Sequence, residues 1–486
     1  MPTATAVRPV RATTAADLAA VYKLPEPPTD PAALAGWERE VCRAAYCANP
    51  VRLAGRIEQA DKRTGEVREA YTTEHEPDGV LLKACGNRRA SVCPACAETY
   101  RRDAWHLIAT GLRGGKGMPE TVREHPRLFV TFTAPSFGAV HTKRVHPGNG
   151  NLLPCHPCDP KAKCEHGRPV ACWHRHPEAE IRTLGRPLCD DCFDWQGLAL
   201  WNALAPELWR RTLGVTIYRT LAHLLSISEA AVKRLVRVRY TKVAEYQARG
   251  AVHFHAVIRL DATPPREDPE QVAPPPAGFT AELLAEAVKA AAATVAVPYP
   301  EVDEDAAGRL ACWGDQLDVR NVTRDGTELS AEAVAAYIAK YATKSTEAFA
   351  GLDRPIHHDD DLDHLKAVPH LARLVRVCWE LGAHPALAGL RLRAWAHALG
   401  FRGHWSTRSR RYSTTFTALR RARVVHAIRR RLRGGEPLDA WGRRASEEAA
   451  VILGTWSFVG RGYSDNDSAY LAVITAARTR EYPDAA

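Results

Sequence analysis

Two segments of the chain alternate hydrophobic and polar residues on either side of a short turn. Residues 243–247 and 252–260 are rich in aliphatic and aromatic residues, and Ala248, Arg249 and Gly250 separate them. Alternation with a period of two is typical of strands, and a glycine between two such runs is typical of a turn. The pattern predicts a β-hairpin, preceded by a basic strand at residues 236–240.

Periodicity also predicts elements outside this hairpin. An apolar run at residues 127–133 predicts a buried strand beneath the hairpin. Apolar residues three and four positions apart predict helices over residues 99–112, 201–212, 217–235, 280–293 and 330–344. Residues 1–40 are rich in Ala, Thr and Pro with little periodicity, which predicts a flexible N-terminal arm.

The second strand of the predicted hairpin carries two histidines, His253 and His255. Residues two apart on a strand share a face, so the two imidazoles can bind one metal ion. We expect the third ligand from the partner strand, with Glu245 as first choice and Gln247 as the alternative, because an oxygen ligand suits Mg²⁺ or Mn²⁺. The competing interpretation is an ordinary polar face on a half-buried strand.

A second group of reactive side chains falls on the last predicted helix, which Ser330 is placed to cap. Tyr337, Lys340, Tyr341 and Lys344 follow the i, i+3, i+4, i+7 spacing, so two phenols and two ammonium groups share one helix face. A partly buried aromatic stripe with extended lysines would give the same pattern. Arginine is much the commoner basic residue in this chain, so two lysines here favour a compact, titratable cation.

Four cysteines predict a zinc-binding module over residues 41–112. Cys93 and Cys96 form a CxxC pair, Cys85 precedes them, and Cys47 lies before a predicted hairpin at residues 51–73. Four thiols, the last two of them a CxxC pair, suit tetrahedral zinc. Cys42 is an alternative to Cys47, and buried free thiols are the alternative to zinc.

A long polar insertion at residues 139–198 is the second region rich in Cys and His. A segment of this length without periodicity needs a substitute for a hydrophobic core, and metal can provide it. We expect one zinc site from Cys172, His174, Cys189 and Cys192, and a further site from Cys155, Cys158, Cys164 and His166. The pairing stays open because His156 and His176 are also within reach. A solvated loop with spare thiols is the alternative.

The charge of the chain points to a polyanionic partner. Its formal net charge is +10 and its pI is near 9.0, which favours nonspecific binding to nucleic acid, although an arginine-rich genome could produce the same bias. Within a basic C-terminal region, residues 351–486, arginines are interleaved with aromatic residues. The DNA-binding candidates there are Arg402, Trp405, Arg408, Arg410 and Arg411. Solvated arginines on surface helices are the alternative.

Three further expectations come from what the sequence lacks. No GxxxxGK[ST] pattern occurs, so no ATP-driven motor is predicted. No uncharged apolar run approaches the roughly 18 residues of a membrane helix, and residues 1–20 have no apolar core of signal-peptide length. We therefore expect a cytoplasmic protein without a membrane partner, in which cysteines bind metal rather than form disulfides.

Three segments together resemble the HUH endonucleases, and more closely the RepSA-like rolling-circle replication initiators of plasmids. They are residues 127–138, residues 245–261 and residues 337–344, in the order found in that family. The likeness extends to residues 85–96 and 399–407. It implies an α+β fold in which an antiparallel sheet flanked by helices forms a nuclease domain over residues 113–350, with a zinc-binding N-terminal module. The residues themselves add the zinc-binding insertion and a basic helical C-terminal region.

The resemblance also implies a reaction. A tyrosine hydroxyl attacks the scissile phosphate of single-stranded or supercoiled origin DNA, giving a 5′-phosphotyrosine and a free 3′-hydroxyl, with Mg²⁺ or Mn²⁺ as the catalytic cofactor and Zn²⁺ as the structural one. Alignment makes Tyr341 the main nucleophile. Tyr337 stands where plasmid relatives have a glutamate, so its role stays open. Lys340 and Lys344 would favour the phenolate and contact phosphate. A host helicase and a host polymerase are the expected partners.

Two other classes of protein remain as alternatives. A conjugative relaxase or a transposase would share this chemistry but process a different DNA site. A noncatalytic, zinc-stabilised DNA-binding regulator would need only the Cys/His groups and the basic C-terminal region. Such a regulator would have no need for the paired histidines or for the helix face that carries two tyrosines and two lysines.

Overall fold

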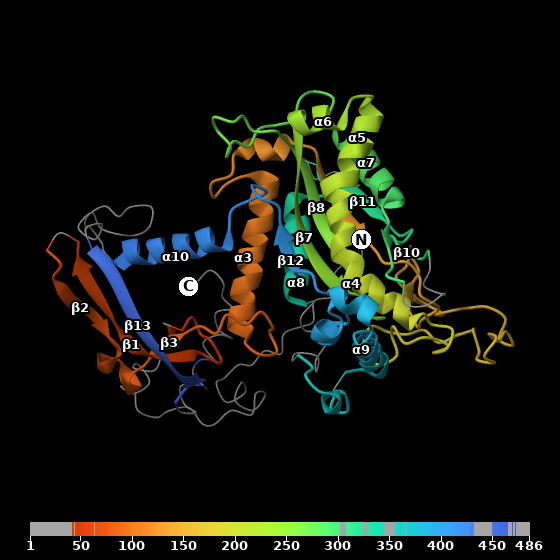
Figure 1. Ribbon diagram of the computed structural model, residues 1–486, viewed down its shortest axis with the longest axis horizontal. Helices are drawn as coiled ribbons and strands as arrows, with labels where there is room; N and C mark the ends of the chain where they lie inside the picture. The colour runs from red at the N-terminus through yellow and green to blue at the C-terminus, as the bar shows by residue number, and fades with distance from the viewer. Residues whose placement is uncertain are drawn as a thin grey trace. The chain divides into compact units, whose positions relative to one another are not determined.

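The computed structural model describes residues 41–472, apart from residues 43, 63, 302–307, 324–328, 345–354, 366, 432–449, 465–468 and 470–471. The expected N-terminal arm, residues 1–40, lies outside the described residues. The chain divides into two compact units (Figure 1). The larger contains residues 105–414, and the smaller contains the described residues before 105 and after 414. None of the described helices is both long enough and apolar enough to cross a membrane.

A five-stranded antiparallel sheet forms the centre of the larger unit, which confirms the α+β class. Its order is β11 (Asp318–Asn321), β4 (Arg127–Phe132), β8 (Val252–Ala262), β7 (Val236–Tyr246) and β12 (Ser406–Arg408). The predicted basic strand and the first hairpin strand are one continuous strand, β7. The hairpin turns at Gly250, whose φ of 88° is in the left-handed region that favours glycine.

The two faces of this sheet differ because successive side chains of β8 point to opposite sides. Phe254 lies on one face and packs against Trp209 of α4 (Trp195–Arg211), with ring centroids 5.6 Å apart. Figure 1 shows α4 running along the front of the strands. His253 and His255 lie on the other face, next to α8 (Ala331–Lys344). The apolar core is therefore on the α4 side, which leaves the α8 side for polar groups.

A buried asparagine of α4 holds the turn of the β7–β8 hairpin. The amide nitrogen of Asn202 donates to the carbonyls of Gly250 and Leu399, both at 2.9 Å, and its oxygen accepts from the backbone N–H of Val252 at 3.0 Å. Each polar atom of this fully buried side chain is thus paired. These hydrogen bonds fix Val252, the first residue of the strand that carries the two histidines.

The other helices of the larger unit are α5 (Ile217–Leu225), which a π-helical turn at Thr212–Thr216 joins to α4, α6 (Glu229–Leu235), α7 (Ala281–Thr294) and α9 (Pro369–Leu381). Short strands pair as β5 (Arg144–Val145) with β6 (Leu152–Leu153), and β9 (Val297–Pro298) with β10 (Leu310–Ala311). The predicted helix at residues 217–235 is two helices, because Ser226 ends α5 in a left-handed conformation and Ser228 caps α6.

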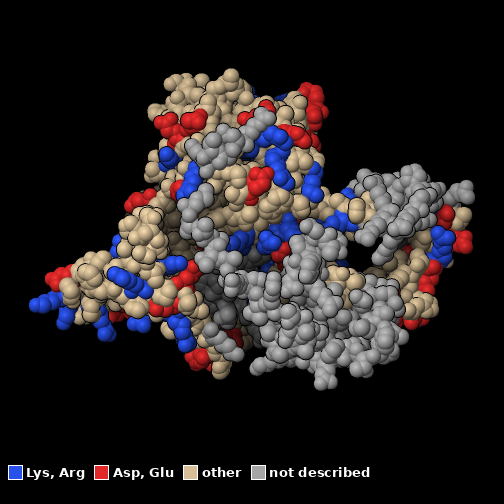
Figure 2. Space-filling view, turned by 180° about the vertical axis from the view of Figure 1, so that it is seen from behind, with Lys and Arg blue, Asp and Glu red and all other residues tan. Residues whose placement is uncertain are grey.

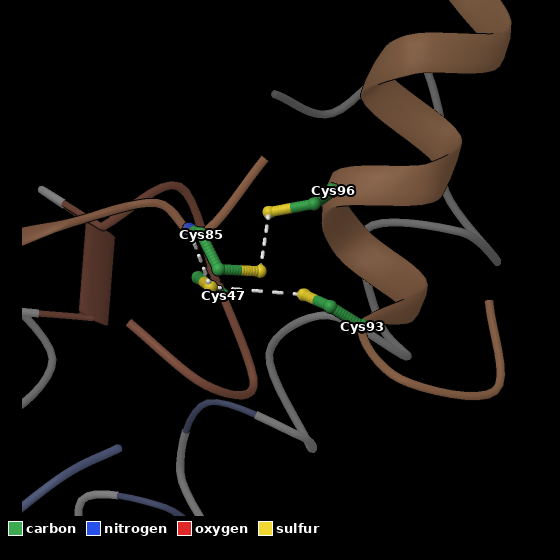
Figure 3. A group of neighbouring side chains, drawn as sticks. All are labelled: Cys47, Cys85, Cys93 and Cys96. Carbon is green, nitrogen blue, oxygen red and sulfur yellow. Dashed lines mark hydrogen bonds between the residues drawn. The ribbon is translucent and has the colours of Figure 1, made fainter. Parts of the chain in front are cut away.

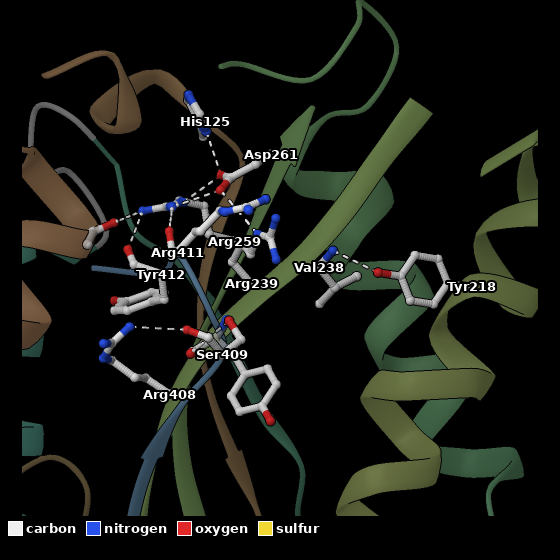
Figure 4. Close-up of polar contacts among 12 residues, drawn as sticks. His125, Tyr218, Val238, Arg239, Arg259, Asp261, Arg408, Ser409, Arg411 and Tyr412 are labelled. Carbon is white, nitrogen blue, oxygen red and sulfur yellow. Dashed lines mark hydrogen bonds and ion pairs between the residues drawn. The ribbon is translucent and has the colours of Figure 1, made fainter. Parts of the chain in front are cut away.

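A buried ion-pair network fastens the segment after β12 to the sheet (Figure 4). Arg259 binds both oxygens of Asp261, at 2.7 and 2.8 Å, and His125 Nδ1 lies 2.8 Å from the same carboxylate. Arg259 also donates to the carbonyls of Tyr412 and Arg411, at 3.2 and 3.4 Å. Because the Asp261 carboxylate pairs with Arg259 and also lies 3.7 Å from Arg239 Nε, this network depends on Asp261.

We expect Asp261→Ala to lower the free energy of unfolding of the larger unit by about 3–5 kcal/mol, because it leaves Arg259 buried and without its charge partner. Urea unfolding followed by tryptophan fluorescence measures this, since buried Trp201 and Trp209 report on the same unit. Glu120→Ala, which removes an exposed pair with Arg123, is the control and should change stability by less than about 1 kcal/mol. Equal effects of the two substitutions would contradict the prediction.

The smaller unit is built from both ends of the described chain. β1 (Val51–Asp61) pairs with β2 (Val67–Thr72), as the predicted hairpin requires, and its first residues also pair with β3 (Leu81–Lys83). Its other edge pairs along its whole length with β13 (Ala450–Arg461). α3 (Pro94–Arg113) begins in this unit, and α10 (Phe416–Arg431) packs there through Phe416, which stacks on Tyr100.

The C-terminal region expected from the sequence, residues 351–486, is divided between these two units. Residues 355–414 belong to the larger unit and supply β12, whereas residues from 415 onward belong to the smaller one. Pairing of β13 with β1 joins residues about 400 positions apart, and local periodicity cannot reveal such a contact. Residues of the C-terminal region thus lie in both units.

Candidate functional site

Three potential metal ligands meet on the α8 side of the sheet. Glu245 of β7 is directly opposite His253 of β8 in the register, and His255 is two residues further along the same face. Glu245 Oε2 lies 3.2 Å from His253 Nε2 and 3.4 Å from His255 Nε2. The hairpin therefore points one carboxylate oxygen and two imidazole nitrogens at a common point, as the sequence predicts.

The protonation states in this cluster suit cation binding. Burial would raise the pKa of Glu245, but its hydrogen bonds with His253 and His255 outweigh burial, so the pKa lies below its usual value. Burial lowers the pKa of His255, and its hydrogen bond with Glu245 offsets only part of that effect. Near neutral pH the site therefore presents a carboxylate and a neutral imidazole, the forms that bind metals.

Gln247, the alternative third ligand, lies in the hairpin turn. It follows the end of β7, and its side-chain oxygen accepts a hydrogen bond from Arg249 Nε at 2.8 Å. That hydrogen bond engages the oxygen with which Gln247 would bind an ion.

The tyrosine helix lies against the same cluster. Ser330 caps α8 as predicted, since its hydroxyl accepts from the backbone N–H of Ala333 at 3.1 Å. The rings of Tyr337 and Tyr341 each lie 5.2 Å from the ring of His255, and 4.5 Å from each other. Residues some eighty positions apart in the chain thus form one site, composed of the metal-ligand cluster and two phenols.

The two tyrosines differ in their surroundings. Tyr337 packs edge-on against Phe129 of β4, at 5.5 Å between ring centroids. Burial raises its pKa, with smaller contributions from the hydrogen bond and charge of Tyr341. Lys340 Nζ lies 5.9 Å from the ring centroid of Tyr341. Lys344 is the last residue of α8, and its side chain lies outside the described residues.

Thr131 is a site residue that the sequence did not indicate. It is paired with His255 in the β4–β8 register, and its Oγ1 lies 3.0 Å from His255 Nδ1. A hydrogen bond at Nδ1 fixes the orientation of the ring and leaves Nε2 free to face Glu245. The predicted strand at 127–133 contained this threonine, but only the cross-strand register identifies its partner.

We expect Thr131→Ala to weaken Mn²⁺ binding by about 10–100-fold, the usual effect of losing a hydrogen bond to a metal-ligating histidine. Thr131→Ser keeps the hydroxyl and should bind Mn²⁺ as the parent does. Titration of the protein with Mn²⁺, followed by electron paramagnetic resonance of the free ion, measures the affinity. If the alanine and serine variants bind equally well, Thr131 does not position His255.

Four cysteines of the smaller unit come together as expected (Figure 3). Cys93 directly precedes α3 and Cys96 lies in its first turn, facing Cys47 and Cys85 from the opposite side. The Sγ atoms of Cys47 and Cys93 are 3.7 Å apart and those of Cys85 and Cys96 are 3.8 Å apart. Four thiolates around one Zn²⁺ at about 2.3 Å would be about 3.8 Å apart, so the group fits this ion. Cys42, the alternative to Cys47, is exposed and contacts Tyr46 instead.

The Cys and His residues of the insertion form two groups that correct the grouping expected from spacing. One group is His141, Cys155, Cys172 and His176, and the other is Cys164, His166, Cys189 and Cys192. Two expected ligands, Cys158 and His174, belong to neither group. Cys158 is exposed, and His174 Nε2 lies 3.1 Å from Glu180 Oε1. Spacing alone favoured near neighbours, whereas the folded insertion brings together residues more than twenty positions apart.

The expected DNA-binding residues of the C-terminal region have mixed environments. Trp405 is half-buried and packs against Phe401 and Tyr246, at 5.0 and 4.9 Å between ring centroids. Arg411 pairs with Glu270 at 2.7 Å, and Arg408 is half-buried in β12. Arg402 and Arg410 are exposed. Figure 2 shows Lys and Arg in several separate groups on the visible described surface, with Asp and Glu among them.

The class and the family of this protein follow from its similarity to known proteins. A protein of Streptomyces ambofaciens named replication initiator protein is 41% identical to this chain over 472 residues, which cover 95% of this chain and 93% of the relative. The chain belongs to the RepSA family, described as replication initiator protein, pSAM2, which matches residues 33–477. It is therefore a plasmid replication initiator. No solved structure matches it.

Proposed function

We propose that this initiator nicks one strand of its plasmid origin by tyrosine transesterification and so starts rolling-circle replication. The observation that carries the proposal is the meeting of Glu245, His253 and His255 with two tyrosines of α8 on one face of the sheet. Such a site has the parts that phosphoryl transfer needs: a place for a divalent cation and a nucleophile beside it. An antiparallel sheet carrying a histidine pair beside a tyrosine helix is also what the resemblance to HUH endonucleases implies.

Glu245, His253 and His255 would hold Mg²⁺ or Mn²⁺. Their separations of 3.2 and 3.4 Å agree with the roughly 3.0–3.4 Å expected between neighbouring ligands about 2.1 Å from one ion. When bound, the ion would bind a nonbridging phosphate oxygen and offset the charge that develops there. Three protein ligands leave coordination positions for the phosphate and water.

The proposed step forms one bond and breaks another. The phenolate oxygen of tyrosine attacks phosphorus and forms the phosphotyrosine ester, while the bond between phosphorus and the 3′ oxygen breaks. The electron pair of that bond stays on the 3′ oxygen, which takes up a proton to give the 3′-hydroxyl. The phosphotyrosine ester conserves the energy of the broken bond for rejoining, and the 3′-hydroxyl would prime a host polymerase behind a host helicase.

Of the two phenols, Tyr341 is the nucleophile that we favour. Lys340 lies beside it and would stabilise the negative charge of the attacking oxygen. Tyr337 is 39% exposed and Tyr341 is half-buried, so burial does not rank the two phenols. Tyr337 would then support the site by packing against Phe129 and His255. Lys344 would contact the phosphate of the DNA.

The exposed arginines Arg402 and Arg410 would contact backbone phosphates of origin DNA. In the smaller unit, Cys47, Cys85, Cys93 and Cys96 would bind a structural zinc ion that takes the place of a larger apolar core.

Incubation with negatively supercoiled plasmid carrying the element's own origin tests the proposal. We expect Mn²⁺-dependent conversion to the open circular form, with protein covalently attached to the 5′ end of the nick. Nicking of a conjugative transfer origin or a transposon end, but not of the replication origin, would favour a relaxase or transposase. Binding of the origin without any nick would favour a noncatalytic regulator.

A further inference from the structure

Eight Cys and His residues of the insertion form two tetrads of side chains outside the nicking site. Within each tetrad one ligand atom from every residue lies within 4.8 Å of the others. The first tetrad consists of His141, Cys155, Cys172 and His176, and the second of Cys164, His166, Cys189 and Cys192. Along the chain, the first two residues of the first tetrad are followed by the first two of the second, then by the last two of the first and the last two of the second. The pairs therefore alternate along the chain.

We propose that residues 138–194 are a cross-braced module that binds two zinc ions, with His141, Cys155, Cys172 and His176 holding one and Cys164, His166, Cys189 and Cys192 holding the other. The thiols bind as thiolates and release their protons to solvent. The inference is independent of the nicking reaction, since it concerns neither the β7–β8 hairpin nor α8.

The first tetrad has the separations of a tetrahedral zinc site. His176 Nε2 lies 3.1 Å from His141 Nδ1 and 3.5 Å from Cys172 Sγ, and Cys155 Sγ lies 4.0 Å from His141 Nδ1. Zinc bonds of about 2.0–2.3 Å to nitrogen and sulfur put neighbouring ligands about 3.3–3.8 Å apart. The three observed distances between ligand atoms, 3.1, 3.5 and 4.0 Å, lie in and around the expected range, so one ion fits among the four atoms.

A carboxylate orients one histidine of this tetrad. Glu180 Oε2 lies 2.7 Å from His176 Nδ1, so the opposite nitrogen, Nε2, faces the tetrad. Metal-bound histidines commonly have such a carboxylate partner, which fixes the ring and its tautomer. His176 is buried, whereas the side chain of His174 is 61% exposed although it contacts the same carboxylate. Of these two histidines, only His176 belongs to the first tetrad.

The backbone brings distant parts of the insertion together at these ligands. His156 and Cys172 form an isolated antiparallel bridge, which places Cys155 beside Cys172, and Lys163 and Pro169 form another next to Cys164. His141 exchanges backbone hydrogen bonds with Gly185 and Arg186, both at 2.8 Å.

Few apolar side chains help to hold this insertion. The two-residue strands β5 and β6 are its only extended ladder among the described residues. Metal ions would supply the cross-links that a larger hydrophobic core supplies elsewhere.

The second tetrad is formed by the other four Cys and His ligands of the same insertion. His166 Nδ1 is 3.2 Å from Cys192 Sγ, and Cys164 precedes a tight turn in which the N–H of Gly167 donates to its carbonyl at 2.9 Å. This tetrad has three thiols and one imidazole, the first has two of each, and the smaller unit has four thiols. The three sites therefore differ in donor set, which makes them separable by spectroscopy.

Zinc content of the purified full chain tests the assignment. Elemental analysis should find three zinc ions per chain, one for each group that contains cysteine. His141→Ala and His176→Ala should each lose at least one ion. Cys158→Ser and His174→Ala are matched controls, because they change the same residue types in the same insertion, and should keep all three.

Cobalt substitution keeps the test valid if an alanine variant misfolds. His141→Cys turns the first tetrad into a site with three thiolates, so it should keep three metal ions while the Co²⁺ ligand-field absorption moves to longer wavelength. Three zinc ions in His141→Ala would overturn the assignment. So would loss of an ion in Cys158→Ser or His174→Ala, or an unchanged Co²⁺ spectrum in His141→Cys.

Discussion

Tyr341→Phe lowers the rate at which the initiator forms a covalent adduct with origin single-stranded DNA by on the order of 10³-fold or more, whereas Tyr337→Phe keeps the rate within about tenfold. The substitution removes only the hydroxyl and keeps the ring against His255, so the fold of α8 is preserved. Lys340 Nζ lies 5.9 Å from the ring centroid of Tyr341 and would stabilise its phenolate. Quenched-flow sampling with labelled DNA and gel separation of the adduct measures both rates.

Peptide mapping of the trapped adduct supplies the control. In the parent protein, mass spectrometry should find the nucleotide on the peptide containing Tyr341. The ranking of the tyrosines is wrong if Tyr341→Phe forms the adduct at the parental rate while Tyr337→Phe does not. If each single variant retains adduct and only the double variant loses it, the two phenols share the reaction.

His255→Ala abolishes Mn²⁺-dependent nicking, with an expected loss of about 10²–10⁴-fold. His255 is the central residue of the site, since its ring contacts Thr131, Glu245 and both tyrosines. Removing it takes one nitrogen ligand from the ion. Nicking of supercoiled origin DNA over a range of Mn²⁺ concentrations measures the effect. His404→Ala, an exposed histidine of the same unit, is the control and should nick as the parent does.

The pH dependence of Mn²⁺ binding gives a second measurement of the same site. Because burial lowers the pKa of His255 below its usual 6.5, the imidazole stays neutral until the pH falls below the usual histidine range. The pKa of Glu245 is also below its usual value, so it stays ionised throughout that range. The contribution of these two ligands to Mn²⁺ affinity should therefore persist on mild acidification. Loss of Mn²⁺ affinity with a midpoint above pH 6.5 would contradict this account of the site.

The local pattern of the sequence was sufficient to predict the elements of the candidate site. A period of two placed His253 and His255 on one face, and a short turn placed Glu245 across from them. A helical period placed Tyr337 and Tyr341 together after the Ser330 cap. In each case the decisive contact lies within about ten residues, or within one element, where periodicity alone determines which side chains are neighbours.

Contacts between distant segments could not be predicted in this way. Thr131 meets His255 only through the β4–β8 register, and His141 joins its tetrad only after the insertion folds back on itself. Trp405 resembles a base-stacking residue in a run of arginines, but the β12 edge brings it onto Tyr246. These are properties of the tertiary arrangement, which a single sequence does not encode locally.

The pairing of β13 with β1 has a consequence for synthesis of the protein. The hydroxyl of Tyr463 donates to the backbone carbonyl of Cys47 at 2.8 Å, and β13 covers one edge of β1 along its whole length. A ribosome must therefore translate the larger unit before this small sheet can close. Nascent chains arrested after residue 414 should leave that edge of β1 unpaired, and release of the full-length chain should close it.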